Sequence, residues 1–155
     1  MTRRIPYKRR RKKLTNYKKR LKLVISGKPR LVVRISNKYL NCQVIKYEPD
    51  GDVTLTTFNS KKLIDYGFKG GKNLQSAYLS GFITGLKALK KGVKKAVLDS
   101  GLKTSIKNSR IYACLKGFIE AGVKVPHSKE VLPDDKLLNK SSLDKYVKKI
   151  KSDIK

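Results

Sequence analysis

The sequence predicts an α/β fold with a mixed five-stranded sheet, two main helices, a basic N-terminal arm and a short C-terminal helix. Residues 29–58 alternate apolar and polar side chains in three short runs, which favours strands, whereas residues 74–125 alternate helix-like and strand-like patterns. The first 47 residues contain seventeen Lys or Arg and no Asp or Glu. At 155 residues the chain suits one domain around one core.

The N-terminal segment predicts two parts. Residues 1–14 are expected to be an extended basic arm, because their like charges repel and Pro6 restricts the residue before it. Residues 15–26 predict a short helix that Gly27 and Pro29 end. We expect its apolar stripe to tether the arm to the domain, and this stripe consists of Tyr17, Leu21, Val24 and Ile25.

Three strands should follow as an antiparallel meander: PRLVVRIS, KYLNCQVIKY and GDVTLTTF. The links between them, SNK and EPDGD, are short and rich in turn formers. In the first strand Leu31, Val33 and Ile35 share one face, and Arg30 and Arg34 share the other. The two arginines could be solvated or could bind phosphate, and we favour binding because few acids are expected nearby to pair with them.

A short helical piece, SKKLIDYG, precedes the glycine-rich stretch FKGGKN. This stretch is not a P-loop, because Tyr66 replaces the first glycine and Asn73 replaces the hydroxyl residue of that motif. It predicts a flexible basic loop. Four of its residues could bind a phosphate, namely Lys69, Gly70, Gly71 and Lys72.

The second half alternates helices and strands. Residues 74–91 predict an amphipathic helix ended by Gly92, VKKAVLD predicts a strand, residues 110–121 predict the second main helix, and VKV before Pro126 predicts the last strand. Right-handed crossovers make the last two strands parallel, so we expect the strand order 3-2-1-4-5.

From Pro133 the chain is polar and rich in lysine, and its end predicts a short, mobile helix. The apolar stripe of that helix consists of Leu143, Tyr146, Val147 and Ile150. We therefore divide the chain into an arm with its tethering helix (1–26), an α/β domain (27–135) and a Lys-rich tail (136–155).

Charge indicates the class of partner. The chain has 39 Lys and Arg against 11 Asp and Glu, a net charge of +28. Such an excess repels itself unless a polyanion neutralises it, so nucleic acid is the first hypothesis, whereas a solubilising surface usually mixes both signs. Binding that makes about 6 to 10 phosphate contacts should lose roughly 10³ to 10⁵ in affinity between 50 and 200 mM salt.

The sequence lacks the residues that other kinds of functional site would need. Cys42 and Cys114 are far apart in apolar patterns and are expected to be reduced core residues. The single histidine, His127, has no neighbouring ligand for a metal. No apolar run approaches the about 18 residues of a membrane span, and the N-terminus lacks the apolar region of a secretory signal. We expect no metal, cofactor, membrane or small-molecule substrate.

Five segments carry a resemblance to a known family: GKPRLVVRISNKYLNCQVI, KGGKN, AYLSGFITGLKAL, AVLDSGL and SRIYACLKGFIEAGVKVPHSKEVLPDD. In this order and spacing they resemble the 5S-rRNA-binding large-subunit ribosomal protein L18 in its archaeal form, over roughly residues 3–135. Bacterial relatives stop near VKV and eukaryotic relatives carry a long C-terminal extension. The segment VPHSKEVLPDD therefore favours the archaeal type.

The resemblance implies a structural, non-enzymatic protein of the cytoplasmic large ribosomal subunit. It would join 5S rRNA to 23S rRNA in the central protuberance, beside neighbouring large-subunit proteins. Carried over by position, it implies RNA contacts in the arm, short helix, first hairpin, glycine loop and second helix start: Arg3, Arg4, Tyr7, Lys8, Arg9, Arg10, Arg11, Lys12, Lys13, Asn16, Tyr17, Arg20, Lys28, Arg30, Arg34, Asn37, Lys38, Lys69, Gly70, Gly71, Lys72, Asn73 and Arg110. No contact is assigned to the C-terminal portion.

Two of these assignments have alternatives. Tyr7 and Tyr17 could stack on bases, whereas Tyr17 could instead belong to the apolar stripe of its helix. Arg110 could contact RNA or pair with Asp99 at the start of the second helix.

Two other functions are also open. A mixed sheet of this ribonuclease-H-like kind occurs in nucleases, whose two-metal chemistry needs converging carboxylates. Asp50, Asp52 and Asp99 are the candidates, but the expected strand order gives no reason for them to converge, and the first two are more simply turn formers. A DNA-compacting protein would be distinguished by equal affinity for duplex DNA and 5S-like RNA at matched salt.

Overall fold

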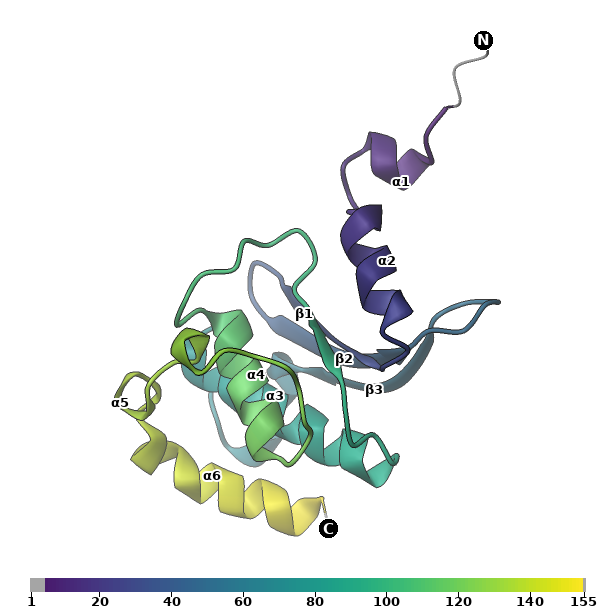
Figure 1. The fold of residues 1–155 in the computed structure, drawn as a ribbon. Coiled ribbons are helices and arrows are strands. Elements are labelled where there is room, and N and C mark those ends of the chain that lie inside the picture. The colour runs from purple at the N-terminus through teal and green to yellow at the C-terminus, as the bar shows by residue number, and fades with distance from the viewer. Residues whose placement is uncertain (1–4, 155) are drawn as a thin grey trace.

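The computed structural model describes residues 5–154, in which four strands form one mixed sheet (Figure 1). The strands are β1 (Arg30–Ile35), β2 (Leu40–Lys46), β3 (Val53–Asn59) and β4 (Val97–Asp99), in the order β3-β2-β1-β4. β1 pairs antiparallel with β2 and parallel with β4, and β2 pairs antiparallel with β3. The meander and the parallel placement of β4 are confirmed.

The prediction of a fifth strand is wrong for the described chain. Residues 123–125 make only an isolated parallel bridge, between Lys124 and Lys95. They lie between Gly122, which has a φ of 115°, and Pro126, which has no N–H to donate. The segment is therefore too short to form a fifth strand. It does lie beside the residues that lead into β4, on the side that the predicted strand order requires.

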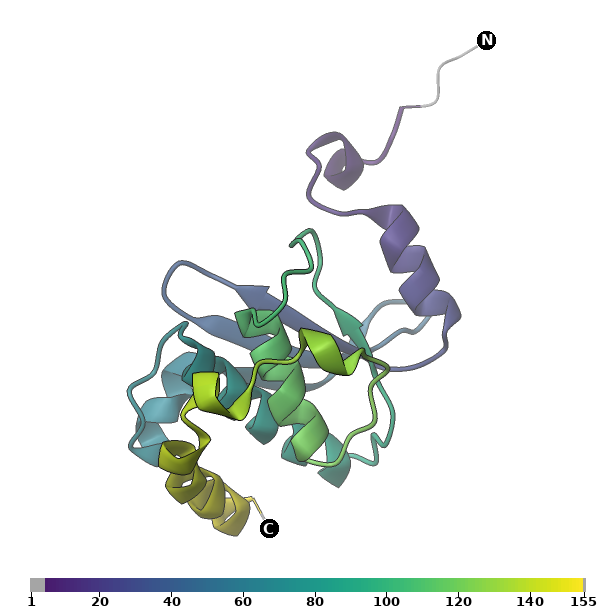
Figure 2. The same cartoon turned by 60° about the vertical axis from the view of Figure 1, so that its left-hand side comes forward.

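Helices α3 (Leu74–Lys90) and α4 (Arg110–Glu120) cover one face of the sheet (Figure 2). They match the two predicted main helices closely. The helices pack backbone against backbone, since a Cβ at Gly81 would overlap the carbonyl oxygen of Cys114 and one at Gly117 would overlap that of Tyr78. Small residues in these helices therefore serve close packing.

The core lies between this helical layer and the inward face of the sheet. Leu31 and Val33 of β1 are buried against the helices, as the alternation predicts. Cys42 and Cys114 are both free and fully buried, with their Sγ atoms 3.0 Å apart. Burial, together with the neighbouring thiol, raises the pKa of Cys42 well above its ordinary value. Both cysteines are reduced core residues, as predicted.

The C-terminal segment packs on the domain. After the short α5 (Asp135–Leu138), α6 (Lys140–Asp153) runs beside α3, at the end of the molecule opposite α1 (Figures 1 and 2). Leu143 and Ile150 are fully buried, and Tyr146 packs against the core. The predicted stripe is correct, but it fastens the helix to the domain instead of belonging to a separate mobile tail.

The N-terminal segment contains α1 (Lys8–Arg11) and α2 (Tyr17–Ile25). The expectation of a wholly extended arm is wrong, because Pro6 constrains only the residue before it and the chain makes one helical turn directly afterwards. The SKKLIDYG segment forms the 3₁₀ helix η1 (Ser60–Tyr66), and a second short one, η2, spans Lys129–Val131.

Candidate nucleic-acid interface

The arm presents cations that nothing in the described protein neutralises. From Lys8 to Lys13 every side chain is exposed, and none forms an ion pair with a residue in the range 5–154. Arg9 donates from Nε to Thr15 Oγ1 at 3.0 Å, which closes the turn after α1. The predicted contacts Arg3 and Arg4 lie outside the described residues.

The two tyrosines of this region lie against each other. The ring centroids of Tyr7 and Tyr17 are 6.0 Å apart at an interplanar angle of 43°. Tyr7 is 78% exposed, whereas Tyr17 is half-buried. Tyr7 therefore offers an open ring face to a partner, and Tyr17 supports it.

Helix α2 is fixed to the domain through polar contacts more than through its predicted stripe. Leu21 is 60% exposed and Ile25 is 74% exposed, so these two residues do not tether the arm. Instead Lys19 Nζ donates to Ser100 Oγ at 3.0 Å and to the Gly101 carbonyl at 3.2 Å.

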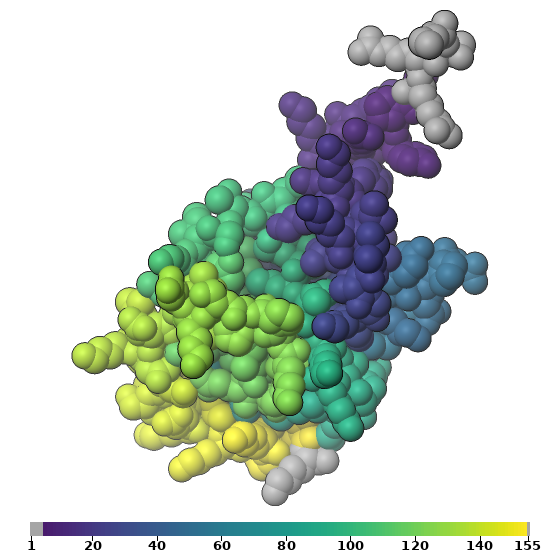
Figure 3. All heavy atoms as spheres, in the orientation of Figure 1, coloured from purple at the N-terminus to yellow at the C-terminus, as the bar shows by residue number. Residues whose placement is uncertain are grey.

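The other polar contact of α2 reaches the β2–β3 loop. Arg20 Nη2 donates to Asp52 Oδ2 at 2.8 Å, and α2 stands beside this loop (Figure 3). Asn16 begins the helix, because its Oδ1 accepts from the Lys19 backbone N–H at 3.1 Å.

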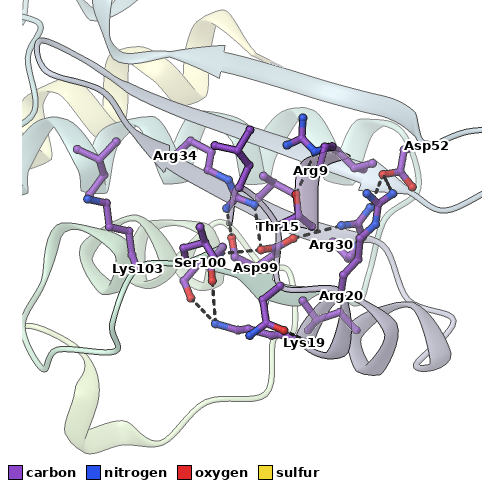
Figure 4. A pocket seen from close by; sticks show the side chains of 18 residues that line it. Arg9, Thr15, Lys19, Arg20, Arg30, Arg34, Asp52, Asp99, Ser100 and Lys103 are labelled. Atoms are coloured by element: carbon purple, nitrogen blue, oxygen red, sulfur yellow. Dashed lines mark hydrogen bonds and ion pairs between the residues drawn. The ribbon is translucent and has the colours of Figure 1, made fainter. Parts of the chain in front are cut away.

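Beneath α2, two carboxylates converge on Arg30 (Figure 4). Arg30 is 4% exposed and donates to Asp52 Oδ2 at 2.7 Å and to Asp99 Oδ2 at 3.2 Å. Arg34 donates to Asp99 Oδ1 at 3.1 Å and to the Asp99 carbonyl at 2.7 Å. The sequence places these acids far from β1, but the fold brings both to it, so the expectation that Arg30 has few acids near it is wrong.

The convergence on Arg30 also bears on the nuclease alternative. Asp52 and Asp99 do lie near each other, but an arginine occupies the space between them where nuclease chemistry would need metal ions. Arg110 does not pair with Asp99, because its Nη1 donates to the Lys72 carbonyl at 3.4 Å. Within residues 5–154 no three His, Cys, Asp or Glu side chains are grouped to hold a metal.

The charges around Asp99 set its protonation. Burial alone would raise the pKa of this carboxyl group, but the Arg34 charge, the Gly101 N–H that donates at 2.8 Å, and Arg30 outweigh burial. The net effect is a pKa lowered from its ordinary value. The ionised carboxylate therefore belongs to the folded state, and it holds β1 and the β4–α4 loop together.

The remaining predicted contacts form two exposed groups. Asn37 and Lys38 lie exposed at the β1–β2 turn. Lys72 and Asn73 meet Arg110 around an open hollow of about 530 Å³ at the starts of α3 and α4, where Asn73 Oδ1 accepts from the Ser76 N–H.

The glycine loop packs in part against η1, whereas its sequence predicts a flexible basic loop. A Cβ at Gly70 would lie 2.6 Å from the Ser60 carbonyl oxygen, so Gly70 allows the loop to pack against the start of η1. Ser60 Oγ also donates to the Gly71 carbonyl at 2.6 Å, which fixes this part of the loop.

Comparison with known proteins identifies the family. The family model of ribosomal large-subunit proteins 60S L5 and 50S L18 matches residues 3–94. Large ribosomal subunit protein uL18 of Aeropyrum pernix is 45% identical over 97% of this chain and 71% of its own length. The uL18 proteins of Methanobrevibacter smithii and Methanococcus maripaludis are 44% and 42% identical, each over 97% of this chain and 78% of their own length.

The chain belongs to the L5/L18 family of large-subunit ribosomal proteins. Membership confirms the resemblance and its archaeal type, since these three uL18 relatives are archaeal. Proteins of the L5/L18 family are RNA-binding components of the cytoplasmic large ribosomal subunit and not enzymes, as expected. No helix within residues 5–154 is long and apolar enough to cross a membrane. The ribonuclease-H-like description of the sheet stays a prediction.

For this L5/L18 protein, sequence reasoning missed the residues that orient the arm. Lys19, Ser100 and Asp52 connect α2 to two loops, yet none was a candidate RNA contact, and Asp52 was considered only as a nuclease carboxylate or a turn former. One signal was present, because Asp52 and Asp99 are rare acids in a strongly basic chain and both adjoin strands. Rare acids in such a chain are expected to serve internal pairing, since an exposed acid would weaken binding to a polyanion.

Proposed function

We propose that this protein binds 5S rRNA and attaches it to 23S rRNA in the central protuberance of the large subunit, beside neighbouring large-subunit proteins. One observation carries the proposal beyond family membership. Cations near the sheet, such as Arg20 and Arg30, are paired with Asp52, whereas the arm cations Lys8–Lys13 have no acidic partner in the described chain. The structure thus separates charges used for folding from charges available to a polyanion.

The physical properties of RNA suit this division. The major groove of an RNA helix is too narrow for side chains to read, so proteins recognise its shape, phosphates and 2′-hydroxyls, and read sequence in unstacked loops. A protruding cationic arm can lie between RNA helices, while a rigid domain determines where that arm points. Arg30 is buried and both of its terminal nitrogens donate to carboxylates, so we leave it out of the proposed contacts.

The proposed contacts then fall on the arm, on Tyr7, Arg34 and Lys28, on the β1–β2 turn, on Lys69, and on the neighbouring Lys72 and Arg110. These groups present exposed or partly exposed polar atoms. Asn16 and Asn73 act first as helix caps, so their role at the RNA would be to hold the neighbouring backbone.

The decisive measurement compares the affinity of the full-length protein for 5S rRNA, for transfer RNA and for duplex DNA of similar length at matched salt. We expect 5S rRNA to bind most tightly, with affinity falling roughly 10³- to 10⁵-fold between 50 and 200 mM salt if about 6 to 10 phosphates are contacted. Equal affinities for 5S rRNA and duplex DNA would contradict the proposal.

A charge-matched pair of variants locates the contact. Replacing Arg10, Arg11 and Lys12 with Gln should weaken 5S rRNA binding and make the slope of log affinity against log salt shallower by about 2 to 3. The control replaces Lys136, Lys145 and Lys148 with Gln, which removes the same charge from exposed sites at the opposite end of the molecule. Equal losses in the two variants would show that net charge alone governs binding. Crosslinking to total cellular RNA would test the 23S rRNA contact.

A further inference from the structure

A hollow of about 370 Å³ lies between the arm, α2, the outward face of β1 and the β4–α4 loop (Figure 4). Its volume is in the range of about 300 to 1,000 Å³ that is usual for sites of small organic groups. It lies on the face of the sheet opposite α3 and α4, and its lining includes Val32 of β1, Leu23 of α2 and Leu102 of the β4–α4 loop.

The lining combines apolar surface with an excess of positive charge. Leu14, Ile35 and Ile45 line it beside the three apolar residues already named. Six cationic side chains and two carboxylates also line it, which leaves four positive charges in excess. Both carboxylates, Asp52 and Asp99, already accept from arginines, so Lys103 and Arg9 form no ion pair with them or with any other acid in residues 5–154.

The walls of the hollow are tied together without a ligand. Lys19 connects α2 to the β4–α4 loop through Ser100 and Gly101, and Arg20 connects α2 to Asp52. Gly101 has a φ of 64° and packs against the guanidinium of Arg34, where a Cβ would lie 2.9 Å from Cζ. A preorganised site loses less conformational entropy when it is filled.

This combination selects the occupant by its chemistry. A free phosphate would make no favourable contact with the apolar walls, and an aliphatic chain would make none with the cations. A nucleotide needs both, because its base has apolar faces and its phosphate is anionic. Unstacked RNA bases commonly lie against apolar, aromatic or guanidinium surfaces of a protein.

We propose that this hollow receives a single unstacked nucleotide of the bound RNA. Its base lies between Leu23 and Leu102 over Val32, and its phosphate meets the rim cations Arg9 and Lys103. The proposal rests on the proposed function, because the nucleotide belongs to the 5S rRNA that the arm contacts. It makes the root of the arm a specific site, beyond a source of charge.

The test fills the hollow from either wall, with a matched control on each. Leu102→Trp and Ile106→Trp change residues of the same loop that are 59% and 62% exposed, but only Leu102 lines the hollow. On α2, Leu23→Trp fills the hollow and Leu21→Trp is its control, because only Leu23 lines the hollow. Because Leu102 and its control are already largely exposed, that pair is expected to fold normally.

The readouts are the dissociation constant for 5S rRNA and the chemical reactivity of each nucleotide in the complex. Stacking of a base on an aromatic side chain contributes about 1 to 3 kcal/mol. The apolar walls of this hollow are aliphatic, so filling it should weaken binding by about 5-fold, at the low end of that range. One nucleotide should regain the reactivity that it has in free RNA, while the salt slope stays unchanged. The control variants should match the unmodified protein.

Three results would overturn the proposal while wild-type binding to 5S rRNA stays intact. The first is equal affinity and footprint for Leu102→Trp and Ile106→Trp, and the second is an affinity loss spread over many nucleotides. The third is micromolar binding of adenosine or guanosine monophosphate in the hollow without competition with RNA, which would mark a mononucleotide site. If the unmodified protein does not prefer 5S rRNA, the proposed function itself fails.

Discussion

Arg20 and Asp52 form the ion pair that joins α2 to the β2–β3 loop, with Arg20 Nη2 2.8 Å from Asp52 Oδ2. The same oxygen accepts from Arg30 Nη2 at 2.7 Å. One carboxylate therefore links the root of the arm to the buried start of β1. The side chain of Arg20 is 41% exposed, whereas that of Arg30 is only 5% exposed, so the Arg30 contact is more sensitive to loss of the carboxylate than the Arg20 contact.

Asp52→Asn should lower the free energy of unfolding by about 1 to 3 kcal/mol, because the buried Arg30 loses a charged acceptor. The measurement is urea unfolding followed by circular dichroism. Glu48→Gln is the control in the same loop, since Glu48 pairs with Lys46 and both side chains are exposed. It should change stability by no more than about 0.5 kcal/mol. Equal effects of the two variants would mean that Arg30 does not depend on Asp52.

Stability should fall in acid partly through Asp99. The pKa of its carboxyl is lowered in the folded protein from an ordinary value of 3.8, so the unfolded chain binds a proton more readily. The contribution is fully present above that ordinary value and is lost as the pH falls through the folded pKa. In Asp99→Asn the dependence of unfolding free energy on pH below about 4 should be shallower than in the unmodified protein. Parallel pH profiles would exclude Asp99 as a source of acid sensitivity.

The contact between α3 and α4 should not tolerate a side chain at Gly81. In Gly81→Ala the new methyl group would overlap the Cys114 carbonyl oxygen, so the helices must separate. Such overpacking typically costs about 1 to 3 kcal/mol and sometimes more. Gly71→Ala is the control, because a Cβ at Gly71 would have no other atom within 4 Å. Thermal unfolding should show a clear loss for the first variant only.

Two adjacent leucines of α5 test whether the C-terminal segment belongs to the cooperative fold. Leu138 is fully buried and Leu137 is 50% exposed. Leu138→Ala should cost about 2 to 5 kcal/mol, whereas Leu137→Ala should cost about 0.5 kcal/mol or less. Both variants should unfold in one transition by circular dichroism. A separate early transition in Leu138→Ala would mean that α5 and α6 unfold independently of the sheet.

Periodicity predicted the elements well wherever local pattern decides structure. The alternation around Leu31 and Val33 placed β1 correctly, and the helical spacing in residues 74–91 placed α3 almost to the residue. The stripe of Leu143 and Ile150 was also predicted correctly from the sequence. The surface against which this stripe packs was not predicted, because docking depends on residues distant in sequence.

The polar contacts could not be predicted for the same reason. Arg30 is separated from Asp99 by 69 positions, and Lys19 from Ser100 by 81, so neither pair leaves a local pattern. The apolar residues of α2 suggested an ordinary buried stripe, yet Leu21 stays exposed because Arg20 and Lys19 determine which side of the helix meets the domain. Charge patterns alone did not distinguish arginines that fold the protein from arginines that face outward.

The long sequence separation between Lys19 and Ser100 also sets an order of events during synthesis. The arm and α2 leave the ribosome first, but their partner loop is made 81 residues later. At about 5 to 20 residues per second, Lys19 waits roughly 4 to 16 seconds before it can contact Ser100. During that interval the cationic segment around α2 lacks the Ser100 contact that orients it. The newborn protein therefore meets polyanions before its arm has a fixed direction.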